Sequence, residues 1–124
     1  QKIFDYCIID EAGQLTEAQV LGPLRKCRKF VLVGDNNQLP PLVQCPEADK
    51  KGMSVSLFER LAKKHSKIAV KSLTIQYRMN SDILLLSNSL IYKGEMKCAN
   101  HKIAKQKIKL NKLWGNTSIP LWIK

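Results

Sequence analysis

Residues 4–11, with the sequence FDYCIIDE, decide the fold, because an apolar run in this stretch ends in two adjacent carboxylates. The run from Cys7 to Ile9 has no polar break, which is typical of a strand buried on both faces of a parallel sheet. Asp10 and Glu11 would then lie at the carboxyl end of the strand, where open α/β sheets bind ligands. Such strings are also typical of a strand that leads into an acidic helix N-cap.

The carboxylate pair has the chemistry of a nucleotide triphosphatase. One carboxylate can hold Mg²⁺ through the water shell of the ion, which prefers hard oxygen ligands and keeps several waters. The next can orient and deprotonate the attacking water.

The chain has 124 residues, of which 44% are hydrophobic, enough for one small domain or for pieces of two. It opens directly on the predicted core strand, and we expect it to be a fragment of a longer protein. No apolar run is long enough to span a membrane, and no signal peptide is recognisable. The four cysteines have no metal-binding spacing, and we expect free thiols in a cytosolic or nuclear protein.

The net charge of +11 is concentrated in the second part of the chain. Residues 1–50 hold 6 Lys and Arg against 7 Asp and Glu, whereas residues 51–124 hold 15 against 3. This surplus favours a polyanionic partner, most simply nucleic acid. A lysine-rich solvated surface is the alternative.

A second buried strand is predicted at 30–33, after a helix that Thr16 caps and that continues to about Leu24. This strand leads into GDNNQLPP at 34–41, at the same sheet edge as Asp10 if the two strands are parallel. Gln38 has an amide that can contact a γ-phosphate and report its loss. The alternative is an ordinary turn rich in Asn and Pro.

The rest of the chain is predicted to alternate helices and strands. We expect a loop at 42–53, a helix that Ser54 caps through about Lys64, and a domain boundary in the connector 63–67. A strand within 68–75 would precede a helix capped by Asn80 or Ser81 and closed at Gly94, and 107–113 would form a last strand. Trp114 and Trp122 are expected to pack against the protein.

Three motifs in this order resemble those of superfamily-one helicases: DEAGQ at 10–14, GDxxQLPP at 34–41 and QYRM at 76–79. The resemblance covers residues 4 to about 98. It implies an α/β fold with parallel sheets made of parts of two RecA-like (P-loop NTPase) domains, 1–67 and 68–124, with ATP bound between them. The GxxxxGK[ST] phosphate loop does not occur in these 124 residues, so we expect the chain alone to be inactive.

A more specific resemblance is to the DNA replication ATP-dependent helicase/nuclease family, which processes flaps. It rests on LGPL at 21–24, GMS at 52–54, SLF at 56–58 and the segment from Asn80 to Gly94. It implies single-stranded or flapped DNA and ATP as partners, replication or repair proteins as further partners, and a nuclear location, with the mitochondrion as a second one. It also implies a nuclease and an iron–sulfur cluster in the full-length protein, both outside this segment.

The resemblance implies a role for each of five residues. Asp10 would bind the Mg²⁺ of Mg-ATP, and Glu11 would be the catalytic base. Gln38 would sense the γ-phosphate, Tyr77 would stack on adenine, and Arg78 would be the arginine finger. Glu11, Gln38 and Arg78 are therefore the catalytic candidates, and all five are ATP-binding candidates.

Two positions depart from the commoner spelling of the superfamily. Gly13 stands where Ser is usual, and Asn36 where His is usual. Two other functions are alternatives to a DNA helicase: an RNA helicase of the nonsense-mediated-decay type, and a strand-binding remnant that does not hydrolyse ATP.

Overall fold

The computed structural model describes residues 2–65 and 68–107, and the fold there is mixed α/β with two small parallel sheets. The chain divides into two compact units, Gln1–Val70 and Lys71–Lys124, which we describe separately. The division follows Val70, three residues beyond the predicted boundary. That the two units are parts of two RecA-like domains stays a prediction.

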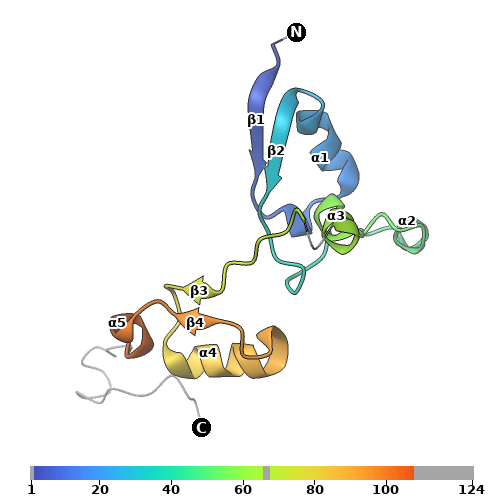
Figure 1. Cartoon of the computed structure of the whole chain (residues 1–124). Helices are drawn as coiled ribbons and strands as arrows, with labels where there is room; N and C mark the ends of the chain where they lie inside the picture. The colour runs from blue at the N-terminus through green and yellow to red at the C-terminus, as the bar shows by residue number, and fades with distance from the viewer. Residues whose placement is uncertain (1, 66–67, 108–124) are drawn as a thin grey trace, which may run out of the picture. The chain divides into compact units, whose positions relative to one another are not determined.

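The first unit is built on two parallel strands, β1 (Phe4–Ile9) and β2 (Cys27–Leu32), joined by helix α1 (Glu17–Leu24). Phe4 lies opposite Cys27 and Ile9 opposite Leu32, so both strands end at the same sheet edge. Figure 1 shows α1 beside the pair. The parallel pairing on which the predicted site depends is therefore confirmed, although β2 begins earlier than the predicted strand at 30–33.

The prediction that these strands are buried on both faces is wrong for the described residues. Tyr6 and Ile8 of β1 are 63% and 71% exposed, and Phe30 and Val31 of β2 are also exposed. The reason is that the described sheet has only two strands, and α1 packs against both of them. The core of this unit includes Val20 of α1 and Leu57 of helix α3 (Leu57–His65), both of which are buried.

Helix α1 begins where the sequence predicts. Thr16 is its N-cap, and the Gln19 side chain accepts hydrogen bonds from the Thr16 backbone N–H and hydroxyl, at 2.8 and 3.0 Å. The bond from the Thr16 N–H is the half of a capping box in which the third helical residue satisfies a donor that the helix itself leaves unpaired. Pro23 lies inside the helix and Leu24 ends it, because a proline in this position interrupts the hydrogen-bond ladder.

Two predictions for the following segment need correction. The predicted loop 42–53 contains a short helix, α2 (Pro46–Lys50), with proline in its first turn, a position that needs no N–H. Helix α3 is Leu57–His65, and Ser56 rather than Ser54 caps it, because the Ser56 hydroxyl accepts from the Glu59 backbone N–H at 3.0 Å. The Ser54 hydroxyl donates to Asp49 instead.

The second unit contains the parallel pair β3 (Ile75–Gln76) and β4 (Lys97–Cys98). Within the predicted range 68–75, only Ile75 is in a strand. Helix α4 (Ser81–Ser87) continues into a π-helical turn, η2 (Asn88–Tyr92), and a last short helix, α5, is His101–Ala104.

Asn80 caps α4 as predicted, and its side-chain oxygen accepts from the Ile83 backbone N–H at 3.0 Å. Lys93 and Gly94 have positive φ and end the helical segment. The predicted strand 107–113 lies, except for Lys107, outside the described residues, as do Trp114 and Trp122. No helix in the described part of the chain is long and apolar enough to cross a membrane.

Candidate functional site: two loops at the strand ends and a turn in the second unit

The loops that follow β1 and β2 continue side by side beyond the sheet. The Val33 backbone N–H donates to the Ile9 carbonyl at 2.8 Å, and the Ala12 N–H donates to the Val33 carbonyl at 2.8 Å. These bonds hold the Asp10–Glu11 turn against the start of the second loop. The short 3₁₀ turn η1 (Ala12–Gln14) then leads toward α1.

Glycines allow the two loops to approach this closely. A Cβ atom at Gly34 would lie 2.9 Å from the Gly13 backbone nitrogen, and one at Gly13 would lie 3.1 Å from the Asp35 carbonyl oxygen. The first distance requires the backbone to shift, and the second requires a displacement of a few tenths of an ångström. Gly13, which replaces the usual Ser, therefore fits this contact without strain.

Glu11 has a left-handed backbone, with φ 50° and ψ 34°. This conformation is rare for a residue other than Gly, Asn or Asp, and such strain costs about 1–3 kcal/mol. The Glu11 N–H donates to the Asp10 carboxylate at 2.9 Å, and the Gln14 side chain donates to the Glu11 carboxylate at 3.2 Å. Both carboxylates are exposed at the strand end.

Gln38 is placed by a turn that Asp35 organises. The Asp35 carboxylate accepts from the Asn37 backbone N–H at 2.9 Å and from the Gln38 side-chain amide at 3.2 Å. The Gln38 backbone N–H also donates to the Asp35 carbonyl at 3.3 Å. The sequence analysis assigned no role to Asp35 or to Gln14. A turn in which an Asp carboxylate accepts from the backbone N–H two residues later is, however, recognisable from its sequence.

Tyr77 and Arg78 belong to the second unit, in a turn between β3 and α4. Both side chains are exposed, and Arg78 makes no ion pair with any of the residues described. Asp82, which lies one helical turn after Arg78, is therefore not paired with it in this structure. The turn itself is held by the buried Gln76 side chain, which donates to the Met79 carbonyl at 2.7 Å.

The structure thus brings three of the five predicted residues into one unit. Asp10 and Glu11 lie at the end of β1, and Gln38 lies in the loop after β2. Within the described residues, no three acidic, Cys or His side chains cluster closely enough to enclose a metal ion. An exposed carboxylate without such a cage fits Mg²⁺, which takes one or two carboxylates and completes its shell with water and phosphate oxygens.

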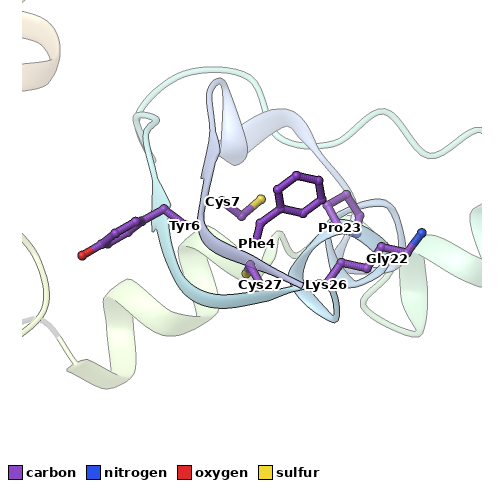
Figure 2. Close-up of a pocket in the computed structure, with 7 residues that line it drawn as sticks. All are labelled: Phe4, Tyr6, Cys7, Gly22, Pro23, Lys26 and Cys27. Atoms are coloured by element: carbon purple, nitrogen blue, oxygen red, sulfur yellow. The ribbon is translucent and has the colours of Figure 1, made fainter. Parts of the chain in front are cut away.

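A shallow hollow of about 550 Å³ lies at the opposite, amino-terminal end of the strands. Figure 2 shows Phe4, Cys7, Pro23 and Cys27 around it. It contains none of the five predicted residues. Desolvation and the neighbouring Cys7 raise the pKa of the Cys27 thiol, and all four cysteines are free thiols.

The sequence matches two family profiles, both described as AAA domain, over residues 1–46 and 53–123. The second covers more than half of the chain, and the chain belongs to the AAA domain family. The fold agrees with this assignment, because both family matches fall on mixed α/β segments that contain a parallel strand pair.

Among its relatives are DNA replication ATP-dependent helicase/nucleases. The chain is 54% identical to the DNA2 enzyme of Homo sapiens over 110 residues, which is 89% of this chain and 10% of that protein. It is 50% identical to dna2 of Schizosaccharomyces pombe over 117 residues, 94% of this chain and 8% of that protein. JHS1 of Arabidopsis thaliana is 46% identical over 121 residues, 98% of this chain and 9% of that protein. The chain spans about a tenth of the length of these relatives.

Proposed function

We propose that this chain is a segment of an ATP-dependent DNA helicase/nuclease of replication and repair, made of parts of two RecA-like domains. It would supply part of the ATP-hydrolysing centre that drives movement along single-stranded or flapped DNA. The observation that carries the proposal is the close contact of the two strand-end loops, which places the Asp10–Glu11 pair beside the loop that leads to Gln38. The identity to DNA replication helicase/nucleases supports DNA as the strand.

The two carboxylates would divide the work. Asp10 would hold the Mg²⁺ of Mg-ATP through water, and Mg²⁺ would neutralise charge on the phosphate oxygens. Glu11 would orient the attacking water and accept its proton. The Gln14 amide, 3.2 Å from the Glu11 carboxylate, and the fixed left-handed backbone support this role because they limit the positions open to the base.

Gln38 and the residues of the second unit would act on the γ-phosphate and the base of ATP. Gln38 would contact the γ-phosphate from the turn that Asp35 holds. Tyr77 would stack on the adenine, and Arg78 would stabilise the charge that develops during γ-phosphoryl transfer. An exposed guanidinium without an ion pair among the described residues supports this assignment, because such a group is available to an anionic ligand.

The experiment compares Glu11→Gln and Asp10→Ala in the full-length protein. Glu11→Gln should keep Mg-ATP binding and lose turnover, because the amide has the same shape and cannot take the proton. Asp10→Ala should weaken Mg-ATP binding. Nucleotide binding by fluorescence and steady-state ATPase rates separate the two effects.

Glu47→Gln in α2 is the matched control, because Glu47 is an exposed carboxylate of the same unit outside the site. It should change neither binding nor turnover. Equal loss of binding in both site variants, or normal turnover by Glu11→Gln, would count against the proposed roles.

A further inference from the structure

Gln76 is a buried amide whose hydrogen-bonding capacity is completely used, by three bonds to the turn that carries Arg78 and one to Cys98. Its side-chain oxygen accepts from the backbone N–H groups of Arg78 and Met79, at 2.8 and 2.6 Å. Its side-chain nitrogen donates to the Met79 carbonyl at 2.7 Å and to the Cys98 sulfur at 3.2 Å. Two acceptor sites and two donors are all that a glutamine amide offers.

This arrangement orders the backbone of Arg78 and leaves the guanidinium available. Gln76 is 8% exposed, and its own carbonyl is fixed in the sheet by the Ala99 N–H at 2.9 Å. On the other side of the turn, the buried Asn80 caps α4 and donates to the Gln106 carbonyl at 3.2 Å. The three residues 77–79 therefore span the short gap between two anchored side chains.

We propose that Gln76 is a positioning residue for the ATPase reaction, which fixes the Arg78 backbone so that the guanidinium meets the γ-phosphate in its reactive geometry. This inference rests on the proposed function, in which Arg78 is the arginine finger. A purely structural role for Gln76 is the competing explanation, because a buried amide with satisfied hydrogen bonds also stabilises a fold. The two explanations predict different responses to volume-matched variants.

Two substitutions separate them. Gln76→Met keeps the volume and removes every side-chain hydrogen bond. Gln76→Glu keeps the two acceptor sites for the Arg78 and Met79 N–H groups, but it removes both donors, turns a carboxylate oxygen toward the Met79 carbonyl and buries a charge. If Gln76 only stabilises the unit, Gln76→Glu is the more damaging change for both stability and turnover, because an unpaired buried charge is costly. If Gln76 positions Arg78, Gln76→Glu keeps more turnover than Gln76→Met even though it is less stable.

The experiment measures kcat and KM for Mg-ATP, together with thermal unfolding, in the full-length protein. Gln76→Met should lower kcat by about 10- to 100-fold, the range expected when a reacting group is misplaced by about 1 Å. In an Arg78→Ala background the same substitution should change kcat by about twofold or less, because groups that act as a unit are not additive.

Asn88→Ala is the matched control. The Asn88 side chain makes a similar pair of bonds to the backbone of Met96, at 2.9 and 3.2 Å, in the same unit and away from Arg78. It should lower the unfolding temperature and leave kcat within about twofold at temperatures where the protein is folded.

The possible results separate the inference from the proposed function. If Arg78→Ala leaves kcat unchanged, the arginine-finger assignment fails and the role of Gln76 fails with it. If Arg78→Ala loses turnover but Gln76→Met does not, or if the two effects are independent, only the role of Gln76 is overturned. The same holds if Gln76→Glu loses more turnover than Gln76→Met.

Discussion

The two units hold their candidate ATPase groups in opposite ways. In the first unit, backbone contacts backbone: the Ala12 N–H bonds to the Val33 carbonyl, and a Cβ at Gly34 would lie only 2.9 Å from the Gly13 nitrogen. In the second unit, one side chain, Gln76, holds the turn that carries Arg78. We therefore expect the loops of the first unit to tolerate changes of side-chain polarity but not an added Cβ at Gly34. The turn of the second unit should tolerate changes of its exposed side chains but not loss of the Gln76 amide.

The largest effect is expected for Arg78, which the turn of the second unit carries. Arg78→Ala should lower kcat by about 10³- to 10⁵-fold with folding retained, because arginine fingers increase kcat by factors of this size. Arg78→Lys should restore little, because a point charge cannot reproduce the forked contact of a guanidinium. Single-turnover ATPase rates and circular dichroism of the full-length variants measure both parts of the prediction.

If kcat of Arg78→Ala stays within a few-fold of the wild type, the hydrogen bonds from Gln76 to this turn have a role other than γ-phosphoryl transfer. Asp82→Asn is a useful control. It removes the carboxylate that could pair with Arg78 at i+4, an interaction worth about 0.5 kcal/mol or less, and the structure contains no such pair. This variant should therefore behave like the wild type.

The next effect concerns the backbone contact of the first unit. Gly34→Ala places a Cβ 2.9 Å from the Gly13 nitrogen, so the loops must separate. We expect a loss of about 1–3 kcal/mol of unfolding free energy, as for other overpacked sites, together with weaker Mg-ATP binding. Urea denaturation and nucleotide titration provide the two measurements.

Gly22→Ala provides the control for Gly34→Ala, because a Cβ at Gly22 has nothing within 4 Å outside its own helix and its chain neighbours. Gly22 lies inside α1, where alanine is favoured over glycine by about 0.5–1 kcal/mol, but it precedes Pro23, whose ring disfavours a helical backbone at a residue with a Cβ. These two effects oppose each other, so Gly22→Ala should change the free energy of unfolding less than Gly34→Ala. If Gly34→Ala changed neither the free energy of unfolding nor Mg-ATP binding, the loops could separate freely, and their close contact would not be needed to position the site.

The smallest effect is expected from the ion pair between α1 and α3. Arg60 donates to both carboxylate oxygens of Glu17, at 3.0 and 2.6 Å, but both side chains remain at least one-third exposed. A double-mutant cycle with Glu17→Gln and Arg60→Met should give a coupling free energy of about 0.2–1 kcal/mol. It should weaken in high salt. A coupling free energy well above this range would mean that side-chain pairing, as well as backbone contact, positions the first unit.

Much of the layout is readable from the residues, because local rules fix it. Thr16 and Asn80 cap helices as their side chains predict, and the apolar runs before Asp10 and Gly34 form parallel strands. Burial was predicted wrongly for Ile8, Phe30 and Val31. The apolar pattern shows which residues of a strand can be buried, whereas their actual burial depends on which other elements are present. The start of α3 was missed because Ser54 and Ser56 are equally good caps by composition, and only the Asp49 bond to Ser54 separates them.

The support of the candidate site was harder to predict. The roles of Asp10, Glu11, Gln38, Tyr77 and Arg78 come from the resemblance and stay predictions. Of the two residues that hold them, Asp35 carries a recognisable turn signature, whereas no local pattern marks Gln76. Their contacts depend on a turn geometry that brings a side chain back to its own backbone two or three residues later.

The left-handed backbone of Glu11 has a consequence for how this position can evolve. Asn and Gly adopt that conformation at lower cost than Glu, so either residue would relieve local strain and raise thermostability. Neither carries a carboxylate that can accept a proton. If Glu11 is the base, the substitutions that most easily relieve its backbone strain would raise thermostability and abolish turnover, so the two properties would be opposed at this position.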